Sequence, residues 1–142
     1  MIMQKLLYTA WVRNNFSQFI DSVVNVKPQT VKRNNDVFWC ISQKMMEELL
    51  AGYSFILKYE QEEDGSFCGS LIPFIDIICV GETLSEMVED AAMKLEAYSH
   101  DYYRHFERNF HAPNERNHFP YILNVLNQED YTGIKKLIKE GE

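Results

Sequence analysis

Residues 83–102 constrain the fold of this chain more than any other segment. Their apolar side chains recur at alternating intervals of four and three, which is the spacing of one helical face: Leu84, Val88, Ala91, Leu95, Tyr98 and Tyr102. The segment opens with Thr83-Leu84-Ser85-Glu86, a capping box in which a hydroxyl and a carboxylate satisfy free amides at the helix start. The sequence therefore predicts a long helix whose apolar stripe packs onto a sheet or another helix.

The residues before this helix predict the sheet. Strand-like patterns, the first two joined by a turn with an Asp64-Gly65 pair, span residues 53–60, 67–71 and 75–80. An earlier helical pattern stops at Ala51-Gly52, so a domain boundary is expected there. For residues 51–110 we expect a three-stranded antiparallel sheet backed by the long helix.

The first fifty residues predict a helix followed by a β-hairpin. Apolar residues spaced by three and four after Thr9 predict an amphipathic helix of about four turns, which Lys27-Pro28 ends. Asn34-Asn35 is expected to turn the chain between two strands. Residues 37–41 are apolar on both alternating faces, so their strand is expected to be central or to be covered by a second subunit.

The remaining residues predict a small helical tail, because residues 119–126 and 131–138 have helical spacing. The predicted fold class is α+β. Its expected domains are a helix and hairpin lobe at residues 1–50, the sheet and long helix at 51–110, and the tail at 111–142.

Charge is unevenly distributed along the chain. The total is −7, but residues 1–50 hold six Lys and Arg against four acidic residues, and the remainder holds eight against seventeen. The halves therefore carry +2 and −9. This asymmetry indicates different partners for the two halves, and phosphates would favour the first. The alternative is that +2 reflects an ordinary soluble surface.

Sequence signatures of catalysis and metal binding are absent. The histidines at positions 100, 105, 111 and 118 do not recur at the i, i+4 spacing of helical metal ligands, so a scattered surface cluster is expected. Cys40, Cys68 and Cys79 form no C-x-x-C pair, which argues against a zinc ribbon or a disulfide framework. No phosphate loop, G-x-S-x-G or H-E-x-x-H motif occurs. We expect no enzyme, cofactor or metal site.

No run of eighteen apolar residues occurs, and the first residues lack the apolar core and cleavage site of a signal peptide. The expected location is the cytoplasm, without a membrane partner.

The segment from Ala10 to Asp21, followed by Val31 to Ser42, resembles the N-terminal half of Phd/YefM-type antitoxins over residues 3–50. The resemblance implies a small dimeric DNA-binding fold that represses its own operon. It places DNA-contacting arginines at Arg13 and Arg33. Their neighbours join them as candidates, on the polar face near the expected helix start and at the hairpin turn: Arg13, Asn14, Lys32 and Arg33. The alternative is a solvated face.

Residues 53–100 resemble the HicB-type antitoxin lobe, a three-stranded sheet backed by a helix. The matching features are a strand at residues 53–57, an acidic turn ending in Gly65, Pro73, and Gly81-Glu82-Thr83 before the long helix.

Together these resemblances imply an antitoxin of a type II toxin-antitoxin system that neutralises a co-encoded toxin and represses its operon. Its expected partners are operator DNA, a basic RNA-cleaving toxin of the RelE or HicA kind, and further copies of itself in a homodimer or higher oligomer. The candidate toxin contacts lie in the acidic turn: Glu60, Glu62, Glu63 and Asp64. The alternative for these four residues is a solvated hairpin without a partner. The alternatives for the whole chain are a stand-alone transcription regulator with a ligand-sensing second lobe, and a degenerate enzyme.

Overall fold

Helices and two mixed sheets make up the computed structural model, which describes residues 3–141 and confirms the α+β class. The chain divides into two compact units, Met1–Glu48 and Leu49–Glu142, hereafter the first and second units. The division falls inside helix α3 (Gln43–Leu50), and each unit has its own sheet and apolar core. The division into domains at residues 1–50, 51–110 and 111–142 stays a prediction.

The sheet of the first unit has the strand order β1-β2-β3. The predicted hairpin is confirmed, with β2 (Gln29–Arg33) antiparallel to β3 (Asp36–Cys40). Asn34 in its turn has a φ of 55°, a left-handed conformation that asparagine tolerates. The short strand β1 (Leu6–Tyr8), parallel to β2, was not predicted.

Strand β3 lies at the edge of this sheet, so the prediction of a central strand was wrong. The unexpected β1 occupies the other side of β2 and makes β2 central. Val37, Phe38 and Trp39 of β3 are consequently 41%, 47% and 58% exposed. Coverage by a second subunit stays a prediction.

The predicted four-turn helix is two helices, α1 (Thr9–Asn14) and α2 (Phe16–Asn25). Asn15 separates them. Its side-chain amide donates to the Trp11 carbonyl at 2.9 Å, and its backbone φ and ψ of −133° and 40° are not helical. Competition of this kind between an asparagine side chain and the backbone interrupts a helix.

The second unit contains a four-stranded sheet in the order β6-β5-β4-β7. Strands β4 (Phe55–Gln61), β5 (Phe67–Ile72) and β6 (Ile78–Gly81) form the predicted antiparallel set. The third strand begins later than predicted, because the Ile77 amide donates to the Phe74 carbonyl at 3.0 Å and closes a turn.

The fourth strand, β7 (Ile138–Glu140), lies parallel to β4 in a segment predicted to be helical. Helix α7 (Tyr131–Lys136) ends before it. The Phe55 amide donates to the Leu137 carbonyl at 2.7 Å, and the Gly141 amide donates to the Leu57 carbonyl at 2.9 Å. These bonds to β4 hold the chain extended, so the predicted sheet of three strands gains a fourth.

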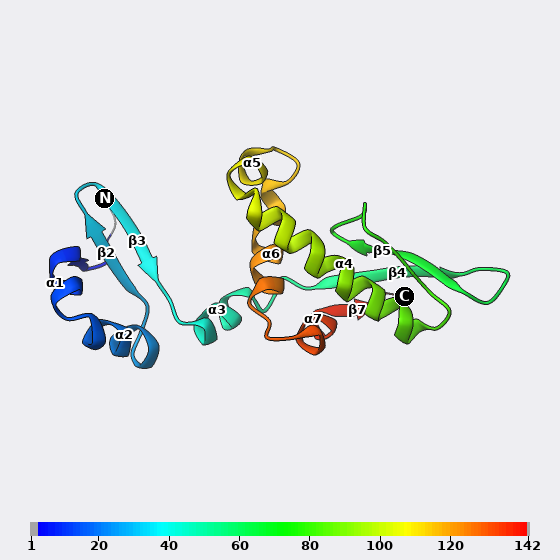
Figure 1. Ribbon diagram of the computed structural model, residues 1–142, viewed down its shortest axis with the longest axis horizontal. Coiled ribbons are helices and arrows are strands. Elements are labelled where there is room, and N and C mark those ends of the chain that lie inside the picture. The colour runs from blue at the N-terminus through cyan, green and yellow to red at the C-terminus, as the bar shows by residue number, and fades with distance from the viewer. Residues whose placement is uncertain (1–2, 142) are drawn as a thin grey trace. The chain divides into compact units, whose positions relative to one another are not determined.

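The predicted long helix is α4 (Leu84–Arg104), which lies along the second-unit sheet with α7 beside it (Figure 1). Thr83 caps it by accepting from the Glu86 amide at 3.1 Å. The Glu86 carboxylate accepts from the amide of Glu82, one residue before the position expected in a capping box. The chain continues through three further helical segments: α5 (Phe106–His111), the 3₁₀ helix η1 (Arg116–His118) and α6 (Phe119–Leu126).

The second-unit core includes Phe55 and Leu57 of β4 and Leu95 of α4, all fully buried. Asn124 of α6 is also buried, and its amide donates to the carbonyls of Leu50 and Tyr53 at 3.1 and 2.8 Å. One buried side chain therefore bonds two backbone carbonyls at the start of this unit and ties them to its helical tail.

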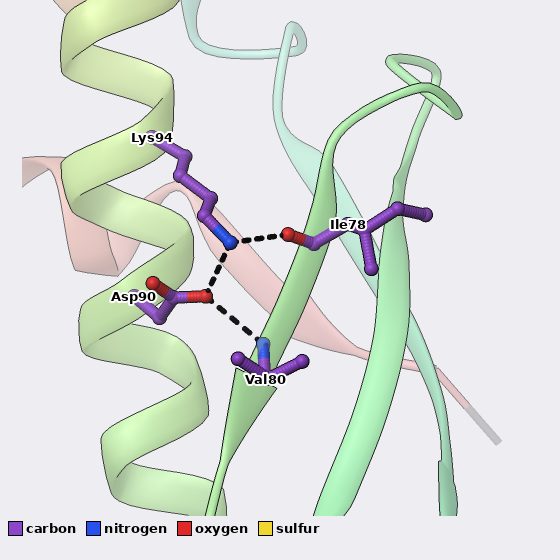
Figure 2. A network of polar contacts seen from close by, with 4 residues as sticks. All are labelled: Ile78, Val80, Asp90 and Lys94. Carbon is purple, nitrogen blue, oxygen red and sulfur yellow. Dashed lines mark hydrogen bonds and ion pairs between the residues drawn. The ribbon is translucent and has the colours of Figure 1, made fainter.

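Two charged residues of α4 close the open edge of β6 (Figure 2). Asp90 accepts from the Val80 amide at 2.9 Å, and the Lys94 ammonium donates to the Ile78 carbonyl at 2.6 Å. The two side chains also form an ion pair at 2.9 Å. Because these backbone groups are the ones that an added strand would need, β6 is protected from pairing with another chain.

Candidate interaction surfaces

The first unit buries few apolar side chains and exposes many. Its buried cluster consists of Phe19, Val23 and Val31. The large apolar residues that it exposes are Met3, Tyr8, Trp11, Phe16, Ile20, Val24, Val26, Val37, Phe38 and Trp39. A small unit with so much exposed apolar surface is typical of an oligomer subunit.

Strand register assigns the exposed side chains of β3 to two faces. Phe38 lies opposite the buried Val31 and shares its face, whereas Trp39 lies opposite Thr30 and points the other way. Trp39 is therefore an exposed aromatic residue outside the Val31 cluster, and it can be replaced without removing a member of that cluster.

The candidate DNA residues all lie in the first unit. Arg13 and Asn14 are exposed, but they are the last two residues of α1 and not near the start of a longer helix, because the chain breaks at Asn15. Lys32 is half-buried and lies beside Tyr8, the residue that precedes α1. Arg33 pairs with Asp36 at 3.2 Å. Both members of that pair are about 70% exposed, so a phosphate can replace the aspartate at little cost.

The candidate toxin residues lie at the β4–β5 hairpin and are all exposed. Asp64 shapes the turn, since its carboxylate accepts from the Ser66 amide at 2.9 Å and from the Ser66 hydroxyl at 2.6 Å. These bonds hold the pKa of Asp64 below its usual value. Within the part of the chain that the structure describes, the carboxylates of Glu60, Glu62 and Glu63 make no such bonds to the turn, so they are better placed than that of Asp64 to meet a partner.

An apolar patch that was not predicted from the sequence lies on the outer face of the second-unit sheet. Ile56, Ile78 and Val80 are 42%, 50% and 51% exposed there. Lys58 and Glu60 follow Ile56 on the same face of β4, and with Glu62 they line a cavity of about 500 Å³ that extends over β5. The sequence feature that could have revealed this patch is the presence of apolar residues at both alternating positions of β4. Exposed apolar surface with charged neighbours is typical of protein-binding sites.

His118 does not belong to a surface cluster, so that prediction was wrong for this residue. It is half-buried in the second unit, where its ring centroid lies 4.3 Å from that of Phe74 and its Nδ1 lies 2.7 Å from the Tyr98 hydroxyl oxygen. Burial lowers the pKa of His118 and raises the pKa of Tyr98 to about 12. Both residues line a second cavity of about 500 Å³.

Stability should decrease in acid partly through His118. Because the folded-state pKa of His118 lies below its ordinary value of 6.5, its contribution is complete above pH 6.5 and is lost as the pH falls further. The loss should be below about 1 kcal/mol, since the site is partly open to solvent. Urea unfolding at pH 7.5 and 5.5 measures it. His118→Gln should lose less stability than the wild type, and the exposed-site control His111→Gln should not. Equal losses in all three proteins would refute this role.

Within residues 3–141, no group of three or more His, Cys, Asp or Glu side chains is arranged to hold a metal ion. No helix in the same range combines the length and apolar character needed to cross a membrane.

Comparison with known proteins identifies relatives over nearly the whole chain. Residues 3–140 match the family PHD_like, described as "Antitoxin of toxin-antitoxin, RelE / RelB, TA system". The structure is similar to a crystal structure described as the antitoxin part of a proposed toxin/antitoxin system from Syntrophomonas wolfei subsp. wolfei. The TM-score is 0.90 at 34% identity, over 97% of this chain and 99% of the other. No curated protein matches the sequence.

Proposed function

This chain belongs to the PHD_like family of antitoxins, and from that membership we propose that its second unit binds and neutralises a co-encoded toxin while its first unit represses the operon. We propose further that the first unit is the Phd/YefM-like part and the second the HicB-like part. In this proposal the protein is a regulator and not an enzyme.

The observation that carries this division of labour is that the two structural units have net charges of opposite sign. The first unit, ending at Glu48, has a net charge of +2, and the second has −9. A basic unit favours phosphates, and an acidic one favours a basic protein such as an RNA-cleaving toxin of the RelE or HicA kind.

Two features of the second unit support toxin binding. The exposed hairpin glutamates offer negative charge, and the neighbouring sheet face offers apolar area at Ile56, Ile78 and Val80. A protein interface needs both, because apolar burial supplies affinity while charge supplies rapid association and selectivity.

Operator binding is proposed to need a dimer. The four candidate DNA residues of one unit contact too few phosphates for useful affinity, and two-fold symmetry doubles them. The exposed apolar residues of β3 and of the first-unit helices supply a surface for that association.

Arg13→Ala and Arg33→Ala should each weaken operator binding several-fold and reduce the slope of its salt dependence by about one per subunit. Gel-shift titrations at several salt concentrations measure both quantities. Arg104→Ala, which removes an exposed arginine from the second unit, is the matched control and should behave as the wild type. Unchanged affinity in both first-unit variants would remove the DNA assignment.

A stand-alone transcription regulator is the alternative function. The cavity beside Tyr98 and His118 favours it, because a small ligand there would contact both α4 and η1. The gene next to this one separates the two proposals: a short reading frame for a basic protein favours the antitoxin.

A further inference from the structure

The cavity beside His118 combines aromatic rings with unpaired negative charge. Tyr98 and His118, both half-buried, form aromatic walls whose ring centroids lie 5.9 Å apart. Asp76 contributes a carboxylate from the loop before β6, and Glu115 contributes another from the residue before η1. None of the residues lining this cavity is a lysine or an arginine.

Both carboxylates are available to a ligand. Among the described residues, neither side chain has an ion-pair or hydrogen-bond partner. Both nevertheless act on the cavity walls: after burial, the charge of Glu115 is the next cause that raises the pKa of Tyr98, and Asp76 raises it as well. The same two charges oppose the effect of burial on the pKa of His118. The cavity therefore has a negative potential that favours a cation.

The type of cation follows from the walls. A guanidinium group is planar, stacks on aromatic rings and donates several hydrogen bonds in one plane, so it can contact rings and two separate carboxylates together. An ammonium group is a more strongly hydrated point charge and gains less from such a site.

The surroundings favour a protein over a small molecule. Ile75 lines the cavity and is 62% exposed, and Asp76 beside it is also exposed. An exposed apolar side chain at the mouth of an acidic cavity gains from being covered by a protein surface, which a small ligand would not provide.

We propose that this cavity receives an arginine side chain from the surface of the toxin. This inference rests on the proposed function, and it adds an anchoring contact to the acidic hairpin. The arginine stacks on the aromatic walls, and its guanidinium donates to the carboxylates of Asp76 and Glu115.

The test is calorimetric titration of the purified co-encoded toxin into the full-length protein. Asp76→Asn and Glu115→Gln should each weaken binding by about five- to tenfold, and the double variant by about thirtyfold or more. Glu107→Gln is the matched control, because it removes an exposed carboxylate from α5 outside the cavity, and it should stay within about twofold of the wild type. Thermal melting should be nearly unchanged in every variant, since neither cavity carboxylate has a partner to lose.

The outcomes separate the two proposals. No binding by the wild-type protein would overturn the proposed function and the cavity contact together. Wild-type binding with an unaffected double variant would overturn the cavity contact alone, and it is also the result expected if the cavity serves a small ligand. If the double variant melts at a lower temperature than the wild type, Asp76→Lys is tested in its place, because this exposed site tolerates a charge reversal. Unchanged toxin binding by Asp76→Lys would overturn the cavity contact.

Discussion

Replacing Trp39 with aspartate is expected to convert the proposed dimer to a monomer and to weaken operator binding by about a hundredfold or more. Trp39 is 58% exposed on an edge strand, in a unit that leaves much of its apolar surface open. An aspartate buried in the subunit interface would lose its hydration without gaining a partner. Each operator half-site would then be bound separately, and the gain from joining two weak sites would be lost.

Trp39→Asp should leave each subunit folded, because Trp39 lies on the opposite sheet face from Val31. Sedimentation velocity gives the oligomeric state, and gel shifts give the operator affinity. Tyr103→Asp is the control: Tyr103 is 59% exposed on α4 of the second unit, so its replacement should alter neither quantity. A Trp39→Asp protein that remains a dimer with full operator affinity would refute the proposed interface.

Removal of residues 1–48 is expected to abolish operator binding and to leave toxin affinity within about threefold of the full-length value. The fragment 49–142 keeps the whole second-unit core, the acidic hairpin and the outer sheet face. It has to begin no later than residue 49, because Leu50 is buried and its carbonyl accepts from the Asn124 amide. It also keeps the −9 charge that is proposed to attract the toxin.

A pull-down of the co-encoded toxin compares this fragment with the complementary fragment 1–48, which serves as the matched control. It lacks the acidic hairpin, the outer sheet face and the cavity beside His118, so it should capture no toxin. Capture by this fragment, together with failure of fragment 49–142, would reverse the proposed division of labour.

Elements that depend on neighbouring residues were predictable from the sequence. The start of α4 follows from Thr83 and Glu86, and its length follows from an apolar stripe within the same segment. The hairpin between β2 and β3 follows from Asn34, whose left-handed conformation is a local preference. In each case the stabilising contact joins residues close together in the sequence, so the local sequence pattern is enough to predict the element.

Elements that depend on residues distant in the sequence could not be predicted from it. Strand β7 has residues with helical spacing, but its bonds to Phe55 and Leu57 of β4 hold it extended. Strand β3 likewise lies at the edge of its sheet because β1 pairs with the other side of β2. The residues of β3 are apolar on both faces, and this local pattern predicts a central strand instead. His118 reads as one of several scattered histidines, since nothing in the local pattern indicates that it contacts Tyr98 on another helix.

The same distinction applies to the candidate sites. The acidic residues of the hairpin were predictable because charge in a turn is a local feature. Which of them shapes the turn was not predictable: only the structure shows that Asp64 accepts hydrogen bonds from Ser66 while the neighbouring glutamate carboxylates do not. Arg33 was predictable as a basic residue, but its pairing with Asp36 across the turn depends on the hairpin geometry.

The most direct test of the central claim is the association kinetics of the co-encoded toxin with the full-length protein and with its Glu60→Lys, Glu62→Lys, Glu63→Lys variant, at low and high salt. Asp64 is left in place because it holds the turn. We expect a stable wild-type complex whose association slows as salt is added, and a folded variant that associates more slowly with a weaker salt dependence. A wild-type protein that forms no complex with this toxin would contradict the proposed neutralisation of the toxin.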